Sequence, residues 1–189
     1  PRPTPVPCTT VSRSVADEGH RDAVVHALNG RALTHILQTH THHDHLDGAA
    51  PLSHRTGAPI HAWHRSAEPT FTPDIGLHDL DMVAGLRVLH TPGHATDHIC
   101  LETADGIILT GDHVMGWSTT LIPPAPHGSV QMFLDSMERL LQRRPRLLLS
   151  AHGPVIEQPE SCMRGLPGKR LSRLESRQDG RRVGKECRS

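Results

Sequence analysis

The chain has 189 residues, enough for one domain of ordinary size with a sizeable core. Twenty Lys and Arg balance twenty Asp and Glu, so no overall field of one sign attracts nucleic acid or an anionic membrane. No apolar run approaches the roughly 20 residues that span a bilayer, and four scattered cysteines without paired zinc spacing fit reduced thiols. We therefore expect a cytoplasmic protein with no membrane partner. The unusual number is 17 histidines, which needs a chemical explanation.

Charge and hydrophobic pattern divide the chain into three segments. Residues 1–16 show no convincing strand period, so we expect an irregular N-terminal segment. Residues 1–163 carry 11 basic and 17 acidic side chains, a net charge of −6, whereas residues 164–189 carry 9 and 3, a net charge of +6. That last segment holds too few large aliphatic residues to offset its ordering entropy. We therefore expect one domain over 17–163, followed by a basic, disordered tail over 164–189.

Helical and strand-like patterns follow one another within that domain. Asp17 is a candidate N-cap of a helix that Gly30 ends. Residues 34–39 are predicted as a short buried strand, residues 49–55 as a short helix, and Ser129 as the N-cap of a longer amphipathic helix. Further strands are predicted at 59–62, 81–83, 86–90, 98–103, 106–110 and 146–150. The fold class is therefore mixed α/β (α+β).

A dense group of metal-binding side chains follows the first predicted strand, in the run THTHHDHLDG at 39–48. Residues two apart in extended chain project to the same side, so His40 and His42 can close on one metal ion. Once the chain turns toward the next helix, Asp44 and His45 are available for a second ion. Imidazole with carboxylate suits zinc and its first-row neighbours. A histidine-rich surface loop is the alternative, but the position directly after a strand favours a metal site.

Three more candidate ligands, His94, Asp112 and His152, each follow a predicted apolar strand and lie beside a glycine. Taken singly, each is more often an ordinary loop residue; taken together, they complete two metal shells. The sequence shows no G-x-S-x-G, P-loop or dinucleotide motif, so a covalent mechanism is disfavoured.

The combined pattern, His-x-His-x-Asp-His followed by a distant His, an Asp and a last His, resembles the metallo-β-lactamase superfamily. The resemblance implies an αββα sandwich with a binuclear centre at one edge. It assigns His40, His42 and His94 to the first metal, Asp44, His45 and His152 to the second, and the bridging position to Asp112. An aspartate at that bridge is similar to hydrolase branches such as glyoxalase II, lactonases and RNA-processing nucleases.

The chain also departs from the family pattern. Members begin with several strands, one ending in a turn whose aspartate supports the site, whereas residues 12–15 read Ser-Arg-Ser-Val. The chain thus resembles a member truncated at the N-terminus, and we expect the first sheet to be incomplete.

These observations lead to a functional hypothesis: a hydrolase with two zinc ions, or manganese or iron as alternatives. A metal-bound hydroxide attacks a small carbonyl substrate such as a lactone, ester or thioester, and Asp44 is the catalytic residue that holds and orients it. The alternatives are a phosphodiesterase or RNA nuclease, with RNA the less favoured partner, and a metal-binding fragment without turnover. The oligomeric state is left open. Four further histidines flank the candidate ligands and either donate hydrogen bonds to them or are simply packed or solvent-facing: His43, His90, His98 and His113. Trp63 and Trp117 are expected in the core or in a pocket wall.

Overall fold

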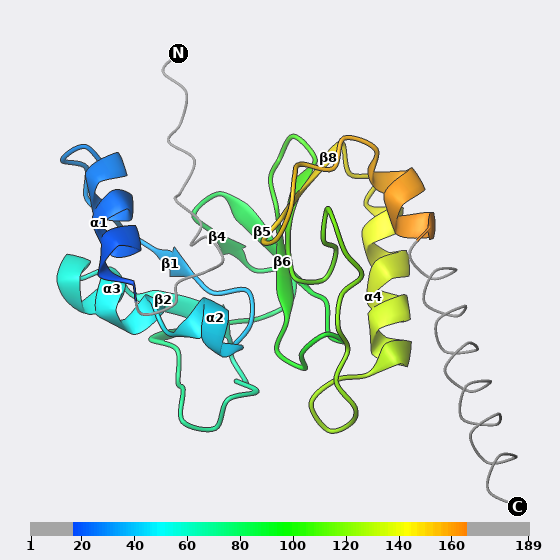
Figure 1. Ribbon diagram of the computed structural model, residues 1–189, viewed down its shortest axis with the longest axis horizontal. Helices are drawn as coiled ribbons and strands as arrows, with labels where there is room; N and C mark the ends of the chain where they lie inside the picture. The colour runs from blue at the N-terminus through cyan, green and yellow to red at the C-terminus, as the bar shows by residue number, and fades with distance from the viewer. Residues whose placement is uncertain (1–16, 166–189) are drawn as a thin grey trace, which may run out of the picture.

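A computed structural model describes residues 17–165, which fold into two β-sheets packed between helices. The layers run helix, sheet, sheet, helix across the molecule (Figure 1), as the αββα expectation requires. The elements are α1 (Glu18–Ala27), β1 (Ile36–Leu37), α2 (His43–Leu46), α3 (Ala49–Thr56), β2 (Ile60–Trp63), β3 (Ile75–Leu77), β4 (Met82–Val83), β5 (Leu86–His90), β6 (Ile99–Glu102), β7 (Ile107–Gly111), α4 (Val130–Gln142) and β8 (Leu147–Ser150).

The first sheet is small and parallel, with strand order β1-β2-β3. The chain crosses from β1 to β2 through α2 and α3, and α1 and α3 cover the outer face of this sheet (Figure 1). Within the described residues this sheet has three strands and the second has five. The expectation of an incomplete first sheet stays a prediction, because residues 1–16 lie outside the described part of the chain.

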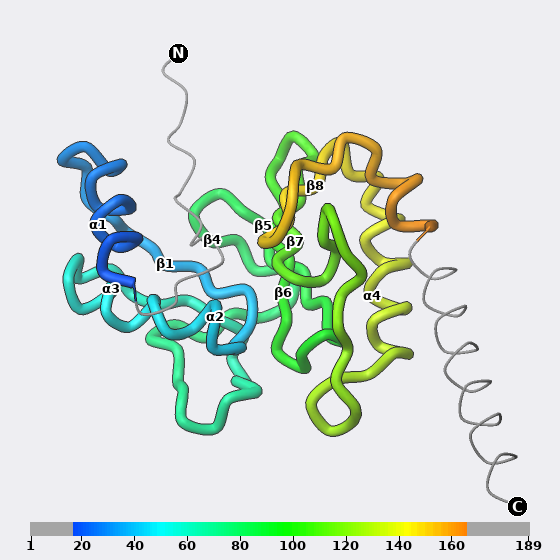
Figure 2. Tube along the Cα trace, viewed as in Figure 1, coloured from blue at the N-terminus to red at the C-terminus, as the bar shows by residue number. Residues whose placement is uncertain are grey.

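The second sheet has the order β4-β5-β6-β7-β8, antiparallel throughout except for the parallel pair β7 and β8. The register shifts between Leu109 and Gly111, at the end of β7. α4 covers the outer face of this sheet, and Figure 2 shows the blue-to-cyan half of the chain on one side of the molecule and the green-to-orange half on the other.

Side chains of alternate strand residues supply three apolar layers, because successive residues of a strand point to opposite faces. Ile36 packs toward the helices of the first sheet, whereas Leu37 packs between the two sheets. In the second sheet Val88 faces the same inter-sheet layer and Leu89 faces α4, whose buried Leu140 belongs to that outer layer. Each sheet therefore has an apolar layer on both of its faces, and these layers hold its strands in place.

The two predicted N-caps and the end of α3 at Gly57 are confirmed, whereas α1 ends at Ala27, before the predicted stop at Gly30. The Asp17 side chain accepts a hydrogen bond from the Gly19 amide at the start of α1, and the Ser129 hydroxyl accepts one from the Met132 amide at the start of α4. α3 ends at Gly57, whose φ of 73° lies in the left-handed region that favours glycine.

The structure differs from the predictions in four described places. The strand predicted over 34–39 is reduced to β1, because only its central residues pair with β2. Three elements were not predicted: the single turn of α2, the strand β3, whose three residues show no clear alternation, and a helix over 159–165. That helix includes the first two residues of the predicted tail; the rest of the tail and residues 1–16 lie outside the described residues. None of the described helices combines the length and apolar character needed to cross a membrane.

Candidate metal centre

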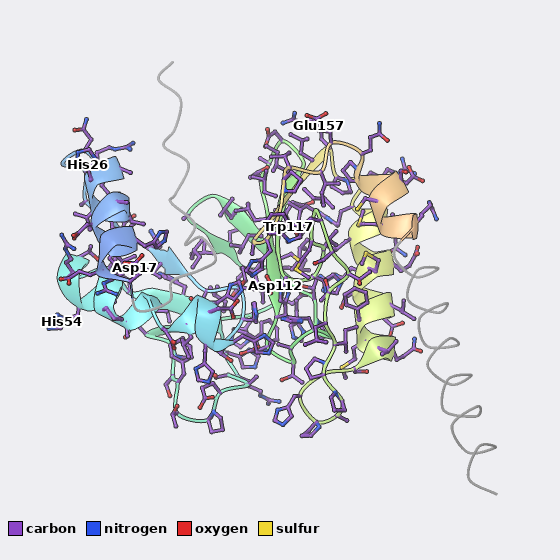
Figure 3. The ribbon with its side chains drawn as sticks, in the orientation of Figure 1. Asp17, His26, His54, Asp112, Trp117 and Glu157 are labelled. Carbon is purple, nitrogen blue, oxygen red and sulfur yellow. The ribbon has the colours of Figure 1, made fainter. Side chains whose placement is uncertain are left out.

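All seven predicted ligands meet where strands of both sheets end. His40 and His42 follow β1, and the single turn of α2 carries Asp44 and His45. The other three lie in loops of the second sheet and its connections, namely His94 after β5, Asp112 after β7 and His152 after β8. Figure 3 shows Asp112 between the two halves of the molecule.

The first group consists of His40, His42 and His94, which offer ligand atoms within 4.8 Å of one another. Their ring centroids lie 4.5–4.9 Å apart, with each pair of rings nearly perpendicular. Three imidazoles that converge in this way match a three-coordinate set that leaves a fourth position for water or substrate.

The second group consists of Asp44, His45, Asp112 and His152. Oδ1 of Asp112 lies 3.4 Å from Nε2 of both His45 and His152. Oδ2 of Asp44 lies 3.7 Å and 3.5 Å from the same two nitrogens. The other oxygen of Asp112, Oδ2, lies 3.7 Å from Nε2 of His94 in the first group. Asp112 therefore stands between the groups, with one oxygen toward each.

These separations fit metal ions. Four ligands that surround zinc tetrahedrally at about 2.1 Å lie about 3.4 Å from one another. Nε2 of His40 and Nε2 of His94 are buried and have no hydrogen-bond partner within the described chain, and a cation between them would offset the cost of burying these lone pairs.

Hydrogen bonds on the far side of the rings direct these nitrogens inward. Nδ1 of His94 lies 2.6 Å from the carbonyl oxygen of Leu121, and Nδ1 of His40 lies 3.1 Å from Oγ1 of Thr39. A carbonyl accepts only, so Nδ1 of His94 carries the proton and its Nε2 presents a lone pair. Outer hydrogen bonds of this kind orient metal-binding histidines in proteins.

Burial keeps the histidines of the first group neutral. Desolvation, followed by the neighbouring His45 and other rings, holds the pKa of His40 well below its usual value. Desolvation also lowers the pKa of His42 and of His94. Burial works to raise the pKa of Asp112, but contact with His45 and the charges of nearby histidines keep it below the ordinary value. Neutral imidazoles around a carboxylate are the protonation states that metal binding requires.

Gly93 allows the chain to bring His94 into place. Its φ is +141°, and a Cβ at this position would lie 2.4 Å from Cα of Phe133 in the first turn of α4. The Gly93 carbonyl also accepts a hydrogen bond from the amide of Ser129, the N-cap of that helix. His94 is thus fixed against α4 by a backbone contact that only glycine permits.

Asp97 is a supporting residue that the sequence analysis missed. Its Oδ2 accepts hydrogen bonds from Oγ1 of Thr41 at 2.6 Å and from the amide of Ala67 at 2.9 Å. Thr41 stands between His40 and His42, so this carboxylate fixes the loop that carries them. The signal available in the sequence was an acidic residue within HTPGHATDH, three positions after the candidate ligand His94.

The flanking histidines divide by environment. His98 accepts a hydrogen bond at Nε2 from the amide of Asp112, whereas His43 is exposed with Nδ1 3.5 Å from Oδ1 of Asp47. His90 stacks on Trp63 at 3.8 Å, and His113 packs against Phe133. Trp63 packs against the inter-sheet layer, as the core alternative predicts, whereas Trp117 is 69% exposed and does not belong to the core, which leaves the pocket-wall alternative.

An αββα sandwich with two adjacent histidine and aspartate groups at one edge of its sheets is the architecture of a superfamily of metal-binding hydrolases. The chain belongs to that family: the profile of the metallo-beta-lactamase superfamily matches residues 12–152.

Individual relatives agree with this assignment. The chain is 32% identical over 139 residues to the beta-lactamase-like protein 2 homolog of Drosophila melanogaster, covering 66% of this chain and 46% of that protein. It is 31% identical over 149 residues to an atrochrysone carboxyl ACP thioesterase of Claviceps purpurea, covering 77% of this chain and 44% of that protein. The chain therefore spans less than half the length of these two relatives.

Solved structures share the fold. A metallo-beta-lactamase family protein from Thermus thermophilus superimposes with a TM-score of 0.74 at 22% identity, covering 89% of this chain and 72% of that one. A beta-lactamase domain protein from Burkholderia ambifaria superimposes with a TM-score of 0.75 at 21% identity, covering 88% and 66% of the two chains.

Proposed function

We propose that the chain carries the catalytic centre of a hydrolase that binds two zinc ions, with manganese or iron as alternatives, and cleaves a small carbonyl substrate. The observation that carries this proposal is the pair of ligand groups with Asp112 between them. His40, His42 and His94 would hold one ion, and Asp44, His45 and His152 the other, with Asp112 shared. When bound, such ions supply Lewis acidity and make a coordinated water acidic enough to react near neutral pH.

Asp44 is the catalytic residue in this proposal. Its Oδ2 faces the second group, where it lies 3.5 Å from Nε2 of His152. Asp44 would hold and orient the attacking water by accepting a hydrogen bond from it. Its side chain is 48% exposed, whereas those of His45 and Asp112 are at most 10% exposed, so Asp44 is the carboxylate that solvent and substrate reach.

A thioester or another acyl compound with an apolar portion is the favoured substrate. The segment after β7 borders the centre, because the Leu121 carbonyl contacts His94 and the Gly116 amide donates to the carbonyl of His152. This segment displays Trp117 and Leu121, which are 69% and 75% exposed. Large apolar side chains exposed beside a polar centre suit an apolar acyl group. The thioesterase relative supports the same choice.

Parallel hydrolysis assays test the proposal. Metal-loaded protein is given a thioester, an acyl-homoserine lactone, a penicillin, bis-p-nitrophenyl phosphate and single-stranded RNA. We expect two metal ions per chain and the highest kcat/KM for the thioester. Asp44→Asn should lower kcat by roughly 100-fold or more at full metal occupancy, because an orienting and electrostatic group is lost.

Asp47→Asn is the matched control, because Asp47 is also in the histidine loop but pairs with the exposed His43. It should retain wild-type kcat. A kcat/KM for the phosphodiester above that for every carbonyl compound would replace this proposal with the nuclease alternative, and metal uptake without any turnover would leave only a metal-binding fragment.

A further inference from the structure

A chain of buried hydrogen bonds lies behind Asp112. The Asp112 amide donates to Nε2 of His98 at 3.2 Å, and Nδ1 of His98 lies 2.9 Å from Oγ1 of Thr91. The Thr91 hydroxyl donates to Sγ of Cys100 at 3.3 Å, and the Cys100 thiol donates to the Thr110 carbonyl at 3.7 Å. His98, Thr91, Cys100 and Thr110 are all fully buried.

The proton positions along this chain are determined by its two ends. An amide only donates, so Nε2 of His98 must present a lone pair to Asp112. The ring proton is then on Nδ1 and is donated to Thr91, whose own proton goes to the sulfur of Cys100. A carbonyl only accepts, so the Cys100 proton is donated to Thr110. Burial raises the pKa of Cys100 to about 12, which keeps the thiol protonated as this arrangement requires.

Both ends of the chain lie on one short piece of backbone. Thr110 and Asp112 flank Gly111, where the register of β7 with β8 shifts and φ is +50°. A Cβ on Gly111 would lie 2.8 Å from Nε2 of His98, so the imidazole is in direct contact with this turn. The ring thus closes a loop of hydrogen bonds that holds the turn in one conformation.

We propose that His98, supported by Thr91 and Cys100, is a positioning residue for the bridging carboxylate. It accepts a hydrogen bond from the Asp112 amide and so fixes the turn that directs one oxygen of Asp112 toward His94 and the other toward His45 and His152. His98 does not itself bind an ion, because its Nε2 faces the amide. This inference rests on the proposed two-metal function.

Metal titration against a competing chelator tests it, together with the absorption spectrum of the cobalt-substituted protein. His98→Leu removes the acceptor and should weaken the binding of at least one ion about 10- to 100-fold, the range found when outer partners of metal ligands are lost. His98→Gln retains an oxygen acceptor near the position of Nε2 and should recover most of the affinity. Thr91→Val leaves the Nδ1 proton without its acceptor and should weaken binding in the same direction, while Thr91→Ser should behave as wild type.

His61→Leu is the matched control, since His61 is a buried histidine of β2 that contacts the ring of His35. It should leave both affinities and the cobalt spectrum unchanged. Wild-type affinities in both His98→Leu and Thr91→Val, or equal defects in His98→Gln and His98→Leu, would overturn the inference while the proposed function stands. Wild-type protein that binds no ion would instead overturn the proposed function itself, and the inference with it.

Discussion

Replacing Gly93 by alanine should damage both stability and the first ligand group. The new Cβ would lie 2.4–2.6 Å from Cα, N and Cβ of Phe133, and two of these atoms are backbone of α4 that cannot move alone. Positive φ costs a residue with a side chain about 1–3 kcal/mol, and overpacking of this kind costs about 1–3 kcal/mol more. We expect the free energy of unfolding, measured by urea denaturation, to fall by about 2–6 kcal/mol.

Gly57→Ala separates the two contributions. Gly57 also has positive φ, at +73°, but a Cβ there meets no atom within 4 Å. This control should lose only the conformational part, about 1–2 kcal/mol. Metal titration should also show weaker binding in Gly93→Ala, because His94 follows directly, and unchanged binding in Gly57→Ala. If the two variants lose equal stability, the backbone contact with α4 does not constrain this turn.

Two further predictions concern the core and the buried histidines. Leu140→Ala removes a fully buried side chain between α4 and the second sheet and should lower the free energy of unfolding, measured by urea denaturation, by about 2–5 kcal/mol. Met132→Ala, at a position 48% exposed on the same helix, should lower it by less than about 1 kcal/mol. Equal losses in the two variants would contradict this packing. Burial lowers the pKa of His113 to about 3 in the folded chain, against about 6.5 in the unfolded chain. Between these two values the unfolded chain binds a proton at this residue and the folded chain does not. The free energy of unfolding therefore falls as the pH is lowered from about 6.5 toward 3. Between pH 7.5 and pH 5 this group alone should remove about 2 kcal/mol from the free energy of unfolding, and His113→Leu should flatten the profile by that amount; a wild-type profile in that variant would show that the ring is not held neutral.

Features that depend on neighbouring residues could be predicted from the sequence, whereas features that depend on distant pairing could not. The caps at Asp17 and Ser129 are local hydrogen bonds, and both were predictable from residue type and position. The bond between Thr41 and Asp97 joins residues 56 positions apart, and no local pattern indicates it. β3 was missed for the same reason, because its pairing with β2 and not its own pattern makes it a strand.

The candidate site likewise has a part that could be predicted from local pattern and a part that could not. The seven residues of the two groups could be selected because each follows a strand, and strand ends meet at one edge of a sandwich. The direction in which each oxygen of Asp112 points could not be predicted from the sequence, since it depends on the register shift at the end of β7 and on the ring of His98.

The two ligand groups draw on both sheets, and this has a consequence for the lifetime of the protein. His40 and His42 extend from β1 of the first sheet, whereas Asp112 and His152 extend from the second, so a bound ion would act as a cross-link between the two halves. A ligand held only by the folded state at 100 times its dissociation constant adds about 2.7 kcal/mol to stability. A chain that has not acquired its ions would lack that tie across the sheet interface, open there more often and be cut sooner by proteases. The same residues would then determine both whether a molecule can react and how long it survives.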